Sequence, residues 1–147
     1  GRDGRSQPLS TLAVHDLAYH YPGSGRGIQE VSFTLDRGSF TVITGQVGSG
    51  KTTLLRALLG LLPHSAGRVL WNSQEIEDLA AWFRPPHCAY TAQTPRLFST
   101  TLRENILLGL SDSRGLGHAV WQAVLDPDVA VLERGLETVV GPRGVRL

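Results

Sequence analysis

The run GQVGSGKT at residues 45–52 restricts the folds open to this chain more than any other feature. It matches the pattern G-x-x-x-x-G-K-[ST] without a break, and that pattern joins a buried strand to the first turn of a helix. The glycines let successive backbone N–H groups turn inward around an anion, while the helix N-terminus adds the positive end of its dipole. The sequence therefore predicts an α/β fold with a phosphate loop at residues 45–52.

The residues on either side of the phosphate loop have the character that the pattern requires. Residues 39–44 (SFTVIT) are rich in β-branched and aromatic side chains, which is typical of a buried strand. Residues 51–62 (KTTLLRALLGLL) are mostly strong helix formers and are apolar on nearly every face. They predict a buried helix that stops before Pro63.

The remaining elements are expected to be short. Residues 1–10 are polar and contain Gly and Pro, so we interpret them as a linker. Apolar residues recur between residues 11 and 21, and apolar and polar residues alternate from Val31 to Leu35, so two strands are expected around the turn-like PGSGRG. Further strands are expected at 68–71 and 88–93, and helices at 79–83, 101–108, 116–124 and 128–135. The helix from residue 101 opens with a capping box, in which Thr101 and Glu104 satisfy each other's backbone donors.

The phosphate loop supplies the candidate binding residues. Backbone N–H groups of Gly45, Gln46, Val47, Gly48, Ser49 and Gly50 are expected to surround phosphate oxygens. Lys51 would reach the β- and γ-phosphates, the Thr52 hydroxyl would bind Mg²⁺, and Thr53 would add a hydroxyl nearby. Lys51 is the only lysine among the 14 Lys and Arg residues, so the one lysine stands where a phosphate needs it.

With these residues in view, the chain resembles the nucleotide-binding domain of ATP-binding cassette (ABC) transporters over nearly all 147 residues. Residues 20–72 look like the family's antiparallel β region, phosphate loop and following helix, in their usual order. The resemblance implies that Tyr21 stacks on adenine, with Tyr19 as the competing candidate. Residues 89–109 (AYTAQTPRLFSTTLRENILLG) look like the family's Q-loop segment, which implies that Gln93 contacts Mg²⁺ and the attacking water.

The same resemblance implies how the chain is organised and what it serves. After the linker, residues 11–98 would hold the β region, phosphate loop and Q-loop, and residues 99–147 part of a helical subdomain. The segment from Leu97 to Gly109 is similar to the exporter-type cassette. The implied function is binding and hydrolysis of MgATP coupled to transmembrane transport, at the cytoplasmic face of the cell membrane. The implied partners are an exporter's transmembrane domain and a second nucleotide-binding domain.

The chain also departs from the family pattern. It contains no Leu-Ser-Gly-Gly-Gln signature, no apolar strand ending in Asp-Glu and no switch histidine. Residues 141–147 look like the run just before the signature, so we expect a truncated domain. Such a fragment would lack a general base and the strands that flank residues 39–44. We therefore expect it to bind nucleotide without hydrolysing it and to be poorly stable alone.

Other functions remain open or are excluded by the residues. A small P-loop kinase, or a nucleotide-binding fragment with no catalysis, would fit the same loop. A GTPase of the phosphate-loop type is excluded, because its Asn-Lys-x-Asp motif needs a second lysine. The balance of 14 basic and 13 acidic residues, without a basic stripe, argues against a nucleic-acid partner. The single cysteine, Cys88, excludes an intrachain disulfide.

Overall fold

The computed structural model describes residues 8–85, 87–94, 96–111, 113–142 and 144. They form two compact units, Gly1–Tyr90 and Thr91–Leu147, which are described separately below as the first and second unit. Most of the predicted linker at residues 1–10 lies outside the described residues, as does most of the run at residues 141–147.

The first unit is built on a four-stranded antiparallel sheet. Its strands are β1 (Thr11–His20), β2 (Gly27–Asp36), β3 (Ala66–Trp71) and β4 (Gln74–Glu75), in the order β2-β1-β3-β4. The central strand β1 pairs with β2 on one side and with β3 on the other. The expected antiparallel β region is therefore confirmed.

A bulge in β1 explains why its apolar residues recur only loosely in the sequence. Leu12 and Val14 are buried at alternate positions, but the next buried residue is Leu17. Between them the pairing with β2 shifts, and Asp16 takes a positive φ of 49°. The Asp16 N–H donates to Ser32 Oγ on β2 at 2.8 Å. The bulge therefore moves the apolar face by one residue and returns Leu17 to the core.

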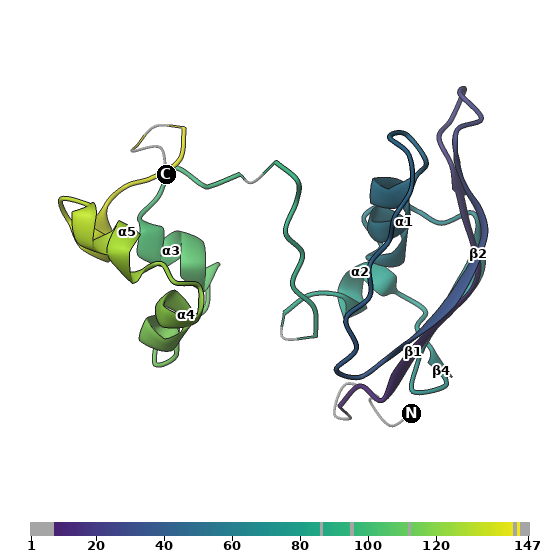
Figure 1. The fold of residues 1–147 in the computed structure, drawn as a ribbon, viewed down its shortest axis with the longest axis horizontal. Coiled ribbons are helices and arrows are strands. Elements are labelled where there is room, and N and C mark those ends of the chain that lie inside the picture. The colour runs from purple at the N-terminus through teal and green to yellow at the C-terminus, as the bar shows by residue number, and fades with distance from the viewer. Residues whose placement is uncertain (1–7, 86, 95, 112, 143, 145–147) are drawn as a thin grey trace. The chain divides into compact units, whose positions relative to one another are not determined.

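Two helices pack against this sheet. Figure 1 shows α1 (Lys51–Leu58) and α2 (Leu79–Trp82) on the same side of the strands. The buried face of α1 carries Leu54, Ala57 and Leu58, which join the hydrophobic core of the sheet. Asp78 caps α2 by accepting a hydrogen bond from the Ala81 N–H at 2.8 Å. The core thus holds α1, and with it the phosphate loop, against β1.

The side chain of Asn72, in the turn after β3, holds the segment that precedes β1. Its Oδ1 accepts from the N–H groups of Ser10 and Thr11 at 2.6 and 3.1 Å, and its Nδ2 donates to the Pro8 carbonyl at 2.9 Å. Asn also tolerates the positive φ of 50° found here.

Replacing Asn72 with alanine is expected to lower the free energy of unfolding by about 1–2 kcal/mol, because two backbone donors lose their acceptor. Urea denaturation followed by tryptophan fluorescence measures this loss. Asn72→Asp is the matched control, because it keeps the acceptor for Ser10 and Thr11, and it should lose less. An equal loss of unfolding free energy in the two variants would contradict the role of the Asn72 side chain as acceptor for Ser10 and Thr11.

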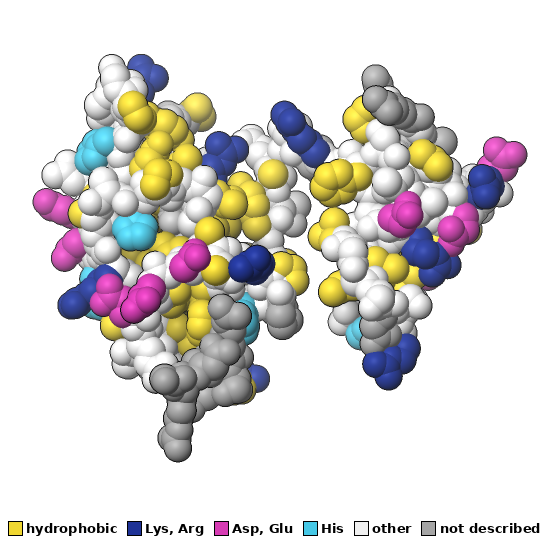
Figure 2. Space-filling view, turned by 180° about the vertical axis from the view of Figure 1, so that it is seen from behind, with side chains coloured by type: hydrophobic (Ala, Val, Ile, Leu, Met, Phe, Trp, Pro, Cys, Tyr) yellow, Lys and Arg dark blue, Asp and Glu magenta, His cyan; other side chains and the backbone are white. Residues whose placement is uncertain are grey.

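Two predicted strands are wrong. Residues 39–44 lie outside any strand or helix, with Phe40 93% exposed. Residues 88–93 likewise form no strand, and their side chains are exposed or half-buried. A strand needs a neighbour to share its backbone hydrogen bonds, and neither segment finds one among the described residues. Hydrophobic side chains accordingly reach the surface of both units in the space-filling view (Figure 2).

The second unit is made of short helices. They are α3 (Leu102–Leu107), α4 (Leu116–Gln122), α5 (Asp126–Val131) and the 3-10 helix η2 (Gly135–Glu137). The predicted helices at 101–108 and 116–124 are confirmed with slightly shorter bounds. The helix predicted at 128–135 exists, but it begins at Asp126 and ends at Val131. In the part of the chain that the structure describes, no helix is long and apolar enough to cross a membrane.

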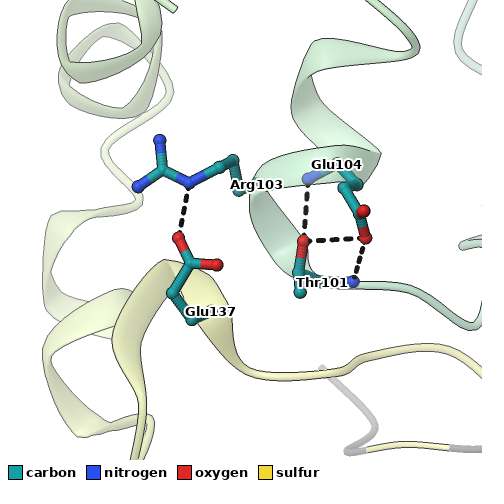
Figure 3. Close-up of polar contacts among 4 residues, drawn as sticks. All are labelled: Thr101, Arg103, Glu104 and Glu137. Atoms are coloured by element: carbon teal, nitrogen blue, oxygen red, sulfur yellow. Dashed lines mark hydrogen bonds and ion pairs between the residues drawn. The ribbon is translucent and has the colours of Figure 1, made fainter.

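A capping box opens α3. Thr101 Oγ1 accepts from the Glu104 N–H at 3.1 Å, and Glu104 Oε2 accepts from the Thr101 N–H at 2.9 Å, so the predicted capping box is confirmed (Figure 3). Beside it, Arg103 Nε donates to Glu137 Oε1 at 2.5 Å. This pair joins α3 to η2, but both side chains are largely exposed, so solvent screens most of its energy.

Candidate functional site

The phosphate loop has the backbone that its sequence predicts. The φ angles of Gly45, Gly48 and Gly50 are 150°, 84° and 93°, values that a residue with a Cβ adopts only with strain. Gly50 is also the N-cap of α1. A Cβ on Gly50 would lie 2.9 Å from Ile28 Cγ2 and 3.2 Å from the Gly27 carbonyl oxygen. Glycine is therefore needed here both for the backbone angle and for close approach to β2.

Lys51, the first residue of α1, folds its side chain back over the loop. Its Nζ donates to the carbonyl oxygens of Gly45 and Gln46, both at 2.7 Å, and lies 3.4 Å from Ser49 Oγ. The ammonium is exposed at these contacts, and the three contacts account for its three N–H groups. An anion entering the loop would therefore meet a positive charge that is already held above it.

A pocket of about 760 Å³ lies beside this loop in the first unit. We call it the loop pocket. It is lined by Tyr21, Ser24, Arg26, Gly27, Gly48, Gly50, Lys51, Thr52 and Thr53. Two of these described lining residues are basic and none of them is acidic, so they favour a negatively charged ligand.

The loop pocket also separates the two tyrosine candidates. Tyr21 lines the pocket and is 36% exposed, whereas Tyr19 is 8% exposed and belongs to the hydrophobic core. The two rings meet edge to face with centroids 4.9 Å apart, so the buried ring supports the exposed one. The Tyr21 hydroxyl lies 3.3 Å from Thr53 Oγ1, the buried hydroxyl of α1. Tyr21 is thus the aromatic ring available to a ligand.

Sequence reasoning missed three lining residues. Ser24 and Arg26 belong to the connection between β1 and β2, Gly27 is the first residue of β2, and the fold brings all three to the phosphate loop. The only signal in the sequence was that a turn containing an arginine follows Tyr21 directly. That signal is weak, because turns carry polar residues for many reasons.

The other predicted residues stand outside this group or remain untested. Gln93 is an exposed residue of the second unit, so its role stays a prediction. Gly45, Gln46, Val47 and Ser49 belong to the phosphate loop but do not line the loop pocket. Among the described residues no three His, Cys, Asp or Glu side chains gather as metal ligands. A divalent cation here would depend on the Thr52 hydroxyl and on oxygens of the ligand itself.

Comparison with known protein families places this loop in a wider context. Residues 28–139, which are more than half of the chain, match the family model of ABC transporters. The match begins at Ile28 in β2 and includes the phosphate loop, Gln93 and all the helices of the second unit.

Individual relatives agree with this match. The probable multidrug resistance ABC transporter ATP-binding/permease protein YheI of Bacillus subtilis is 34% identical over 92% of this chain and 24% of its own length. The mycobactin import ATP-binding/permease protein IrtB of Mycobacterium tuberculosis is 36% identical over 99% of this chain and 25% of its own length. A solved bacterial Atm1-family ABC exporter with ATP bound superposes with a TM-score of 0.77 at 28% identity, covering 95% of this chain and 25% of that one. The chain therefore spans about a quarter of the length of these relatives.

Proposed function

Because the chain belongs to the ABC transporter family, we propose that its first unit binds MgATP in the loop pocket. One observation carries the proposal, namely that an aromatic ring and a phosphate loop face the same pocket from different segments. Tyr21 follows directly after β1, while Lys51 and Thr52 come from the start of α1. A flat ring for a base and a cationic loop for phosphates are the two kinds of group that a nucleoside triphosphate requires.

Mg²⁺ is proposed to enter with the nucleotide. Thr52 lines the loop pocket next to Lys51, and its hydroxyl suits a hard cation that keeps several waters and binds mainly phosphate oxygens. When bound, the metal would neutralise charge on the phosphates and orient them. Gln93 is proposed as a second contact to Mg²⁺ and to the attacking water, as the family resemblance implies.

The complete protein is proposed to be an ATPase that couples hydrolysis to transport, at the cytoplasmic face of the cell membrane. Its partners would be a transmembrane domain and a second nucleotide-binding domain. The structural neighbour is an exporter, which supports the exporter type, but IrtB is named for import, so likeness in this segment does not set the direction of transport. The 147 residues contain no Leu-Ser-Gly-Gly-Gln motif, so we propose nucleotide binding alone for this part of the chain.

The proposed binding of MgATP is tested by measuring nucleotide affinity with and without Mg²⁺ by isothermal titration calorimetry. Thr52→Val, which removes the hydroxyl at nearly constant volume, is expected to lower MgATP affinity about 5- to 10-fold. The affinity for ATP in the presence of a chelator should change less than about 2-fold, because the lost contact goes through the metal. An equal loss in both conditions would contradict the metal-binding role of Thr52.

Tyr21 offers a second test, directed at the base. Tyr21→Ala should weaken MgATP binding about 5- to 10-fold, because one stacked ring is worth about 1 kcal/mol or more. Tyr21→Phe keeps the ring and loses only the contact to Thr53, so its affinity should stay within about 2-fold of the parent. If the phenylalanine variant lost as much as the alanine variant, the hydroxyl rather than the ring would be the contact.

A further inference from the structure

The loop pocket holds a second cation that the phosphate-loop motif does not contain. Arg26 lies in the connection between β1 and β2, yet it lines the same pocket as Lys51. Among the described residues, no acidic side chain lines the pocket, so none of them balances either charge there. A pocket with two unbalanced cations calls for a ligand that carries more than one negative charge.

The turn fixes where Arg26 stands relative to the tyrosine. The Tyr21 N–H donates to the Arg26 carbonyl at 2.8 Å, so the two residues face each other across the hairpin. The Arg26 N–H lies 3.3 Å from Ser24 Oγ, which in turn lies 3.3 Å from the Tyr21 carbonyl oxygen. The backbone of Arg26 is therefore held by its own turn and is hydrogen-bonded to the backbone of the tyrosine whose ring we assign to the base.

The next residue brings Arg26 equally close to the phosphate loop. The Gly27 carbonyl oxygen would be 3.2 Å from a Cβ placed on Gly50, so the start of β2 abuts the N-cap of α1. Arg26 immediately precedes this contact. A guanidinium on a three-carbon stem at this position reaches the space in front of the helix N-terminus, where an anion would lie.

The guanidinium of Arg26 is also free to bind. In the residues that the structure describes, its side chain is exposed and has no hydrogen-bond or ion-pair partner; the bonds recorded for Arg26 are those of its backbone. Five N–H donors in a planar fork match pairs of phosphate oxygens, and such charge-assisted bonds are about twice as strong as neutral ones.

We propose that Arg26 is a second cationic ligand of the nucleotide's phosphate chain, contributed by a segment outside the phosphate loop. The proposal rests on the proposed binding of MgATP and deepens it. Lys51 would hold the phosphates from the loop, while Arg26 would hold them from the β1–β2 connection. Arg26 would thereby favour nucleotides with several phosphates over nucleosides, and would link the residues that contact the base to those that contact the phosphates.

The test measures the affinities for MgATP, ADP, AMP and adenosine by calorimetry, in the complete natural protein that contains these residues. Arg26→Gln is expected to weaken MgATP binding about 5- to 10-fold, a modest loss because solvent screens an exposed side chain. The affinity for adenosine should stay within about 2-fold of the parent's. The loss should shrink as phosphates are removed. Arg26→Lys keeps the charge but loses the planar guanidinium, so its MgATP affinity should lie between those of the parent and Arg26→Gln.

Arg37→Gln is the matched control, because Arg37 is an exposed arginine of the first unit that does not line the loop pocket. It should bind all four ligands like the parent. An unchanged MgATP affinity in Arg26→Gln, or an equal loss for adenosine, would overturn the phosphate contact. Lys51→Ala distinguishes failure of the proposed MgATP binding from failure of the proposed Arg26 contact. If Lys51→Ala binds MgATP like the parent, the proposed function is wrong. If Lys51→Ala loses affinity and Arg26→Gln does not, only the role of Arg26 is wrong.

Discussion

Replacing Lys51 with alanine is expected to lower the affinity for MgATP about 30- to 100-fold, which is the largest functional effect of any single change in the loop pocket. A lysine that meets two phosphate groups makes charge-assisted hydrogen bonds worth about 2–3 kcal/mol in total. Nothing nearby can replace it, because Lys51 is the only lysine in the chain and Arg26 approaches from a different segment. Calorimetric titration with MgATP measures the loss.

The lysine also has a role before ligand binds, and the experiment has to separate the two. Its Nζ donates to the carbonyl oxygens of Gly45 and Gln46, so Lys51→Ala removes these contacts within the loop as well as the contact to the ligand. Thermal unfolding without nucleotide therefore serves as the control. The loop contacts are exposed, so the melting temperature should shift by only a few degrees. A variant that melts like the parent and still binds MgATP equally well would contradict the assignment of the phosphate loop.

Replacing Leu17 with alanine is expected to lower the free energy of unfolding by about 2–5 kcal/mol, the largest effect on stability. Leu17 is fully buried, at 0% exposure, on the central strand β1 just after the bulge. Its loss leaves a cavity at the point where the sheet and α1 share a core. Since small domains are stable by only about 5–15 kcal/mol, this change removes a large share of the margin.

Urea denaturation followed by the fluorescence of Trp71, a buried residue of the same core, measures this effect. Leu61→Ala is the matched control, because Leu61 is a leucine of the same unit that is 56% exposed. It should change the free energy of unfolding by less than about 0.5 kcal/mol. Similar losses in both variants would mean that burial at Leu17 does not decide stability.

The local features of the chain were predictable because each depends on residues a few positions apart. The glycines of the phosphate loop adopt positive φ angles that follow from their own lack of a Cβ. The capping box depends on Thr101 and Glu104, three residues apart. The alternation from Val31 to Leu35 marks β2 through the two-residue period of a strand.

Whether residues 39–44 and 88–93 form strands could not be predicted from nearby residues in the same way. Their β-branched and aromatic residues favour extended backbone, and the backbone is indeed outside any helix. Composition, however, says nothing about whether another segment supplies the donors and acceptors of a ladder. That depends on residues far away in the chain, and among the described residues none supplies them.

The sequence by itself determined the glycine-rich loop, the start of the helix that follows it and the ABC transporter family, because each depends on a short run of residues. The helix predicted at 51–62 ends at Leu58 in the structure. Only the tertiary structure decided which tyrosine faces the loop pocket. Tyr19 and Tyr21 stand two residues apart, where a regular strand would turn both to the same face, but Tyr21 follows the last residue of β1. Tertiary structure alone also brought Arg26 to the pocket, because the core that packs α1 against the sheet sets the distance between the β1–β2 connection and the phosphate loop.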